Sequence, residues 1–286
     1  MNTIIVINGG IGKSVLFTAV AKAFKKQNQD SKLIVVTAWP DVFYNNPNVD
    51  RVYAATEATY LYEDYIEKDY VAVLEDPYNT WDWVKPNAEK HLAQIWSQML
   101  GVEYRDEEPE LFFSHSEILK FKNSIKIDKP ILVYQGLGGI KTDPNEYGWW
   151  RDIPNEVGTK ILEKYPDYYR VQVGLPGTVQ ITGADQLVTG MTTRDFLALC
   201  YFADFAIGGD SVLQHVRGAC KKPSLFYLKA ESIVKKLGWK TNTFVLPRVE
   251  QEIKAGKWAF RDRTDISGIP WEDPFQDPNE IWELKN

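Results

Sequence analysis

Both halves of the 286-residue chain open with a strand, a glycine turn and a helix, and this alternation constrains the fold more than any other feature. In the first half, the β-branched run 3–7 predicts a buried strand, and Gly9 and Gly10 follow it as a tight turn. Apolar residues then recur with helical spacing over 16–24, and 33–36 predicts the next strand. A strand–helix–strand order predicts a parallel sheet with a right-handed crossover.

The alternation restarts at the strand 131–134, which a second glycine-rich turn follows. We also expect strands at 51–53, 70–74, 169–173, 205–207 and 225–228, and helices at 87–100, 155–164, 193–203 and 211–220. The sequence therefore predicts two doubly wound domains, 1–125 and 126–255, with a crossing somewhere in 103–128. A tail, 256–286, is expected to pack back on the body. In such sheets ligands bind beyond the carboxyl ends of the strands.

The composition argues against several kinds of binding partner and location. A net charge of -6 and a pI near 5.3 give no general attraction to nucleic acid or to an anionic membrane. The start of the chain lacks signal-peptide character and no stretch approaches eighteen apolar residues, so we expect a cytoplasmic protein without stable membrane insertion. Cys200 and Cys220 lack metal-ligand spacing, and we expect reduced packing residues and no metal site.

Within the most informative part of the sequence, from Thr189 to Pro223, residues 208–211 form the turn between a predicted strand and a predicted helix. Backbone N–H groups and the positive end of a helix dipole converge at such a turn. Asp210 or Ser211 can cap the helix, and His215 lies one turn further along the same face as Ser211. The alternative is that Asp210 is only a cap and His215 only a core histidine.

Together, Thr189–Leu199, Ala203–His215 and Lys222-Pro223 resemble the C-terminal signature of the heptosyltransferases, family 9 of the GT-B glycosyltransferases. That signature contains an Asp-Ser-Gly-x-x-His turn, whose glycine is replaced here by Val212. Arg151 stands in the basic position of a segment that resembles the family's basic-x-Trp-Pro, and Asn46–Val52 resembles its Asn-Pro-x-Val-Asp.

The resemblance implies a GT-B-like fold, in which two Rossmann-like parallel-sheet domains face a cleft. It also implies a glycosyltransferase that moves a sugar from a nucleotide-diphosphate sugar to an acceptor hydroxyl by a metal-independent inverting displacement, with the nucleotide sugar as co-substrate and no other cofactor. Arg151, His215 and the helix that begins near Asp210 are expected to stabilise the leaving phosphates. The donor-binding residues implied are Gly12, Gly136, Arg151, Gly174, Gly190, Met191, Thr192, Gly209, Asp210, Ser211 and His215.

The implied acceptor is a saccharide, such as a lipopolysaccharide core, or a hydroxymethylated DNA base. Tyr78, Trp81 and Trp83 occupy the region that faces the acceptor in the family, where aromatic rings stack on sugars or bases; they equally suit a small aromatic core under a loop. The family's general base is an Asp, and Lys13 replaces it here, so either another carboxylate serves as the base or the loop binds an anion. Lys13 can then help to stabilise the leaving phosphates or bind a phosphate of the acceptor. Candidates for the base are Asp76 first, then Asp41 and Asp82, each of which also suits a turn or a cap.

Two other functions stay open. Gly9–Ser14 has the glycines, lysine and hydroxyl of a phosphate-binding loop, which predicts an ATPase, although Ile7 stands where the full pattern has its first glycine. The third hypothesis is a catalytically inactive nucleotide-sugar binder. The transferase is favoured, because an ATPase leaves the pattern from Thr189 to Pro223 unexplained.

Overall fold

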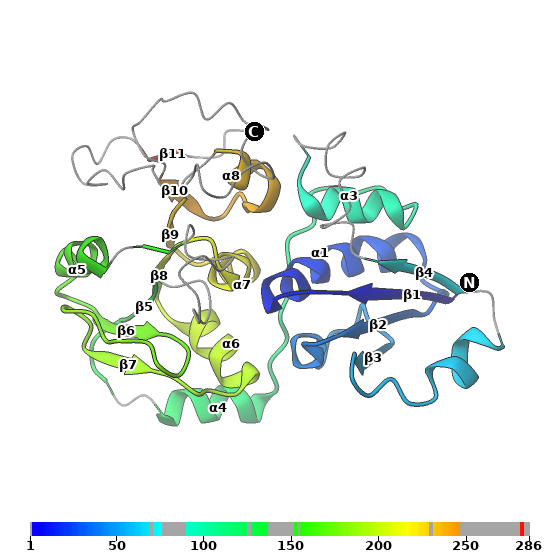
Figure 1. The fold of residues 1–286 in the computed structure, drawn as a ribbon, viewed down its shortest axis with the longest axis horizontal. Helices are drawn as coiled ribbons and strands as arrows, with labels where there is room; N and C mark the ends of the chain where they lie inside the picture. Colours follow the sequence, from blue (N-terminus) through cyan, green and yellow to red (C-terminus); the bar gives the residue numbers. More distant parts are fainter. Residues whose placement is uncertain are drawn as a thin grey trace. The chain divides into compact units, whose positions relative to one another are not determined.

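The structure is a computed structural model, and it describes residues 2–68, 71–75, 90–124, 127–136, 152–153, 155–228, 231–245 and 281–282. The chain divides into two compact units, Met1–Ile118 and Leu119–Asn286. Figure 1 shows that each unit is a β-sheet with helices packed on it.

The first unit has a four-stranded sheet in which every neighbouring pair is parallel. Its spatial order is β3-β2-β1-β4, which places β1 inside the sheet. The strands are β1 (Asn2–Ile7), β2 (Leu33–Thr37), β3 (Arg51–Ala54) and β4 (Val71–Glu75). All five residues of β2 are buried, as expected for a strand of a covered parallel sheet.

Helix α1 (Ile11–Gln27) is the first crossover, and ten of its residues from Ser14 to Phe24 are buried. Helix α3 (Leu92–Met99) contributes Trp96, whose ring lies 5.9 Å from that of Phe17 on α1. A short 3-10 turn, η1 (Pro40–Phe43), follows β2, and a π-helical turn, η2 (Tyr62–Ile66), follows β3.

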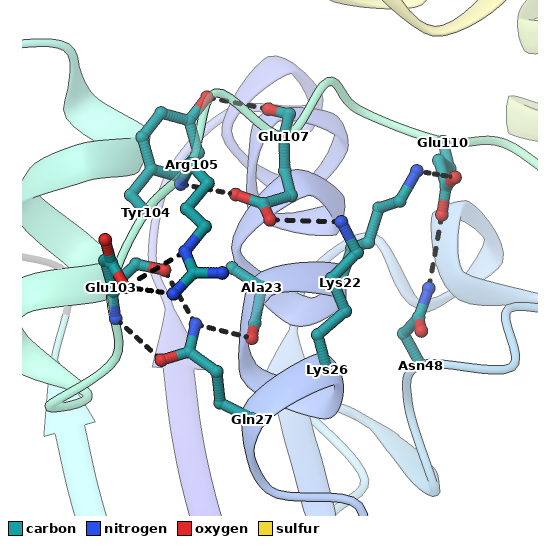
Figure 2. A network of polar contacts seen from close by, with 10 residues as sticks. All are labelled: Lys22, Ala23, Lys26, Gln27, Asn48, Glu103, Tyr104, Arg105, Glu107 and Glu110. Atoms are coloured by element: carbon teal, nitrogen blue, oxygen red, sulfur yellow. Dashed lines mark hydrogen bonds and ion pairs between the residues drawn. The ribbon is translucent and has the colours of Figure 1, made fainter.

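The segment 103–110 belongs to the first unit and runs beside α1, as Figure 2 shows. Lys22 pairs with Glu110, Lys26 Nζ lies 3.2 Å from Glu107 Oε1, and Gln27 exchanges hydrogen bonds with the backbone of Glu103. The charged residues of the predicted crossing therefore hold the outer side of a helix.

The second unit has a seven-stranded sheet in the order β11-β10-β9-β8-β5-β6-β7. All neighbours are parallel except the pair of β10 with β11. The strands are β5 (Ile131–Gln135), β6 (Tyr169–Val173), β7 (Gln186–Val188), β8 (Phe205–Gly208), β9 (Ser224–Tyr227), β10 (Thr243–Val245) and β11 (Ile281–Trp282).

Five helices accompany this sheet: α4 (His115–Ser124), α5 (Asn155–Glu163), α6 (Thr193–Phe202), α7 (Val212–Cys220) and α8 (Glu231–Leu237). Helix α4 carries the chain from the first unit into the second. Its Phe121 ring lies 5.2 Å from the ring of Phe202, and its Lys120 Nζ lies 2.5 Å from Asp195 Oδ1. These contacts hold α4 against α6.

Each sheet has one point where the chain reverses its direction of winding. In the first unit the chain passes outward from β1 to β2 and β3 and then returns to add β4 on the other side of β1. In the second unit it passes from β5 to β6 and β7 and returns to add β8 on the other side of β5. Such switch points, at the carboxyl ends of the strands, are where doubly wound sheets bind ligands.

The predicted α/β fold class is confirmed, with every predicted strand present to within one or two residues at either end. The described elements that were not predicted are α4, β7, α8, β10 and β11, together with the short helical turns η1 and η2. Across the described parts of the chain, no helix is both long and apolar enough to span a bilayer.

Candidate functional site

Four predicted donor-site glycines lie at one edge of the second sheet. Gly136, Gly174 and Gly209 directly follow β5, β6 and β8, and Gly190 follows the end of β7 by two residues. These four strands are neighbours in the order β8-β5-β6-β7 and all run parallel. The structure therefore brings together residues that are up to 73 positions apart in the sequence, as the pattern of strands predicted.

Two of these glycines have a structural reason of their own. Gly190 has a φ of 69°, a left-handed conformation that glycine adopts without strain. A Cβ at Gly136 would lie 2.4 Å from the buried hydroxyl of Tyr134, so this glycine leaves room for that ring. Burial also raises the pKa of Tyr134. The proposed role of Gly136 in donor binding stays a prediction beside this packing role.

The turn from β8 into α7 is fixed to β5. Gly209 N donates to Gln135 O at 3.2 Å, and a Cβ at Gly208 would lie 2.9 Å from the same carbonyl oxygen. Only a glycine at 208 lets the two backbones approach so closely. The amino end of α7 is thereby held at the β5/β8 switch point.

The turn uses its polar side chains differently from the capping that we predicted. Ser211 is the N-cap residue of α7, but its side chain makes no capping hydrogen bond and its Oγ lies 3.3 Å from Gly209 O. Asp210 is buried, and its Oδ1 accepts a hydrogen bond from Gln214 Nε2 at 2.8 Å. A carboxylate therefore lies beside the helix start, held by the first turn of α7.

His215 is buried, with 5% of its surface exposed, and it is held by a residue that the sequence did not indicate. Trp239 Nε1 donates to His215 Nδ1 at 2.9 Å, and the two rings meet edge to face. The predicted role of His215 at the donor is neither confirmed nor excluded by this burial.

Two buried amide oxygens in this part of the second unit were also missed. Among the described side chains, Gln135 Oε1 and Gln214 Oε1 are buried without a hydrogen-bond partner. A buried oxygen left unpaired costs about 1–3 kcal/mol. Both amide oxygens can accept a hydrogen bond from a ligand hydroxyl or amine. A single glutamine at the end of a strand, like Gln135, or in the first turn of a helix, like Gln214, is too common to single out from the sequence.

Met191 and Thr192, which we predicted at the donor, lead into α6. Thr192 is the N-cap of α6, and its Oγ1 accepts a hydrogen bond from Asp195 N at 3.2 Å. Met191 is partly exposed and precedes this cap. The cap gives Thr192 a structural role of its own, since side-chain capping stabilises a helix start by about 1 kcal/mol.

Arg217 on α7 is fully buried and closes the carboxyl end of α6. Its guanidinium donates to the carbonyl oxygens of Cys200, Ala203, Asp204 and Pro223 at 2.7–3.4 Å. Burial lowers the pKa of this guanidinium. Arg217 thus fixes the far end of α6, whose start follows the predicted donor residues Met191 and Thr192.

The switch point of the first unit is built around the turn from β1 to α1. Gly9 has a φ of 106°, and Lys13 Nζ folds back over it to donate to Asn8 O at 3.1 Å. Trp39 Nε1 donates to Gly9 O at 2.9 Å. Ser14 is fully buried, and its Oγ lies 2.9 Å from Thr37 Oγ1.

This geometry argues against the phosphate-binding loop. Helix α1 already begins at Ile11, so Gly12, Lys13 and Ser14 lie in its first turn, and only three residues link it to β1. Lys13 N donates to Gly10 O, and the Ser14 hydroxyl is paired with Thr37. A phosphate loop instead directs its backbone N–H groups and its hydroxyl at phosphate and magnesium. Gly12, which we predicted at the donor, lies in the first turn of α1 and therefore in the first unit.

Of the predicted acceptor-side residues, the structure describes Asp41, which lies partly exposed in η1 beyond the end of β2. Arg151 lies outside the described residues, as do Asp76, Tyr78, Trp81, Asp82 and Trp83. Asp76 directly follows β4, the neighbour of β1 in the sheet. In the described parts of the chain, no three His, Cys, Asp or Glu side chains form a group that can hold a metal ion.

Solved structures with a similar fold include glycosyltransferases. A glycosyl transferase family 9 protein from Veillonella parvula has a TM-score of 0.67 at 15% identity, over 86% of this chain and 85% of that one. E. coli ADP-heptose lipopolysaccharide heptosyltransferase II has a TM-score of 0.64 at 13% identity, over 86% and 90%. A further E. coli heptosyltransferase, solved with ADP, has a TM-score of 0.57 at 12% identity, over 86% and 93%.

No protein-family model matches the chain, and no curated protein matches it in sequence. The likeness to the solved structures establishes the fold: the chain has a GT-B-like fold of the heptosyltransferase type. The predicted resemblance is confirmed at this level.

Proposed function

We propose that this protein is a glycosyltransferase that moves a sugar from a nucleotide-diphosphate sugar to a hydroxyl of a saccharide. The observation that carries the proposal is the β5/β8 switch point, where the amino end of α7 and the turn 208–211 lie beside β5 in a fold shared with heptosyltransferases. A helix start at such a point suits a diphosphate. One of the similar enzymes was solved with ADP, which supports a nucleoside diphosphate as the donor's leaving group.

The proposed reaction is an inverting displacement. The acceptor oxygen attacks the anomeric carbon, the bond from that carbon to the diphosphate oxygen breaks, and the diphosphate leaves with the bonding electrons. The N–H groups at the start of α7, the His215 imidazole and the Arg151 guanidinium stabilise the charge on the departing phosphates. No metal is required for this stabilisation.

The proton of the acceptor hydroxyl passes to a carboxylate base. Asp76 is the first candidate, because it follows β4 at the switch point of the first unit, and Asp41 and Asp82 are the next. Lys13 is proposed to contact an anionic group of a substrate. Tyr78, Trp81 and Trp83 are proposed to stack on the acceptor saccharide.

The test is a panel of nucleotide sugars, read first as a thermal shift and then as release of nucleoside diphosphate. A glycosyltransferase gives both a shift and turnover with at least one donor and a saccharide acceptor. A shift without turnover, across saccharide acceptors and hydroxymethylated DNA, assigns the protein as an inactive nucleotide-sugar binder. Turnover on DNA alone corrects the acceptor, and the absence of any shift overturns the proposal.

A further inference from the structure

The turn between α8 and β10 is attached to the first two turns of α7. Besides the hydrogen bond from Trp239 Nε1 to His215 Nδ1, Asn242 Nδ2 donates to Gln214 O at 2.8 Å. Asn242 is itself fixed by Ser224 Oγ, 3.0 Å from its Oδ1, and by the bond from its N to Trp239 O. All four side chains are buried. The residues on either side of the peptide bond between 214 and 215 are thus held from the same turn.

The indole lies on α7 because Gly218 has no side chain. A Cβ at Gly218 would lie 2.7 Å from Trp239 Cγ and Cδ1, well inside contact distance. Gly218 is three residues beyond His215, so both face the indole. Trp239 is 3% exposed, so its ring is enclosed by the protein beside the imidazole.

An indole N–H can only donate, and this fixes the chemistry of His215. Because Nδ1 accepts, the single proton of the neutral imidazole must lie on Nε2, so that Nε2 is a donor. Without the indole, either nitrogen can carry the proton. A donor suits the oxygens of a diphosphate, which only accept hydrogen bonds.

We propose that Trp239 is a positioning residue of the nucleotide-sugar site, which holds His215 in the tautomer that donates from Nε2 to the donor's diphosphate. The proposal rests on the proposed function for the identity of the diphosphate. The tautomer itself is a property of the protein alone and is measured without any ligand.

The experiment is long-range ¹H–¹⁵N NMR on protein labelled at histidine. The chain has three histidines, and His215→Gln identifies the signals of the third. We expect His215 of the wild-type protein to carry its proton on Nε2 alone. In Trp239→Phe, which keeps a ring but removes the N–H, the His215 signals are expected to shift to a mixture of both tautomers.

The matched control is Trp96→Phe. Trp96 is as deeply buried, but its indole Nε1 has no hydrogen-bond partner and its ring lies on Phe17 in the other unit. This variant loses the same N–H and is expected to leave the His215 signals unchanged. Gly218→Ala, which displaces the indole from its seat, provides a second way to break the bond if Trp239→Phe does not fold.

Measuring the affinities of the wild-type protein and the variants for ADP, GDP and UDP tests whether the His215 tautomer affects diphosphate binding. We expect Trp239→Phe to weaken the best of the three by about tenfold, the upper end for one hydrogen bond, and Trp96→Phe to leave it unchanged. A wild-type His215 with its proton on Nδ1, or an unchanged tautomer in Trp239→Phe and Gly218→Ala, overturns the positioning role while the proposed function stands. If the tautomer shifts as expected but no nucleoside diphosphate or nucleotide sugar binds the wild-type protein, the proposed function fails, and with it the link to the diphosphate.

Discussion

The turns from β1 to α1 and from β8 to α7 share the same backbone arrangement but differ in the hydrogen bonds that their residues make. Each joins a buried strand to a helix through glycine at the switch point of a parallel sheet. In the first, donors from Lys13 and Trp39 cover the carbonyl oxygens of the turn. In the second, the turn is anchored through the N–H of Gly209, and Asp210 lies beside the helix start.

The helices that follow are also held differently. Helix α1 is held on its outer side by ion pairs such as Lys22 with Glu110, whose side chains are about one-third exposed. Helix α7 is held by the buried Arg217 and by Trp239. A motif in the sequence can thus mark where a turn lies at the edge of a sheet, while its contacts decide what the turn can bind.

The largest difference in stability between the two regions is expected when the cationic side chains that hold their helices, Arg217 and Lys22, are replaced. Arg217→Met removes a buried donor from four carbonyl oxygens, three near the end of α6 and that of Pro223, and we expect it to destabilise the second unit by about 3 kcal/mol. Lys22→Met removes a partly exposed ion pair and should cost less than about 1 kcal/mol. Urea unfolding followed by hydrogen exchange assigns each loss to its unit. Equal losses would mean that the two helices are held alike.

The glycines of the turns give the next contrast. Gly208→Ala places a Cβ against Gln135 O and within 3.3 Å of Leu213 Cδ2, so we expect a loss of about 1–3 kcal/mol. Gly10→Ala is the matched change in the other turn, where a Cβ meets nothing within 4 Å and φ is -76°. It should cost less than about 1 kcal/mol, mostly through the poorer N-cap. Thermal unfolding of the two variants measures the difference, and a tolerated Gly208→Ala contradicts the close approach of β8 to β5.

Whether a helix or strand could be predicted from the sequence depended on how clear its hydrophobic pattern is. Strand β6 was predicted with its observed bounds because its β-branched core is flanked by breaks in the pattern. Helix α4 was missed because most of its residues are polar. None of its residues is buried, so it has no buried apolar face of the kind that marks a helix in the sequence. The three-residue strands β7 and β10 are too short to produce a periodic pattern.

The backbone positions of the candidate site were predicted, and its side-chain contacts were missed. Parallel strands bring their carboxyl ends together, so the positions of Gly174 and Gly209 follow from the order of elements alone. The hydrogen bond of Trp239 to His215 joins residues 24 positions apart across two elements, and no spacing rule predicts it. Likewise, Ser14 matched a magnesium-binding hydroxyl by type, but burial against Thr37 gives it a structural partner.

That partnership predicts a smaller, measurable coupling. Ser14→Ala and Thr37→Val each remove one hydroxyl of a buried pair, and each is expected to cost about 1 kcal/mol. Because the two hydroxyls bond to each other, the double variant should cost less than the sum of the single ones, by about 0.5–1 kcal/mol. A double-mutant cycle in urea measures this coupling, and additive losses would leave the Ser14 hydroxyl without its structural role.

The smallest change in stability is expected at Lys13. The same substitution also tests directly whether the β1–α1 turn is a phosphate-binding loop. Its ammonium donates to the exposed Asn8 carbonyl, so Lys13→Met should change the stability by less than about 1 kcal/mol. In a phosphate-loop ATPase the same change abolishes magnesium-dependent ATP hydrolysis. Here only three residues link β1 to α1 and the Ser14 hydroxyl is paired with Thr37, so we expect no such hydrolysis in the wild-type protein and none in the variant. Hydrolysis by the wild-type protein that Lys13→Met abolishes would contradict the proposed nucleotide site at the β8–α7 turn and place it at the β1–α1 turn.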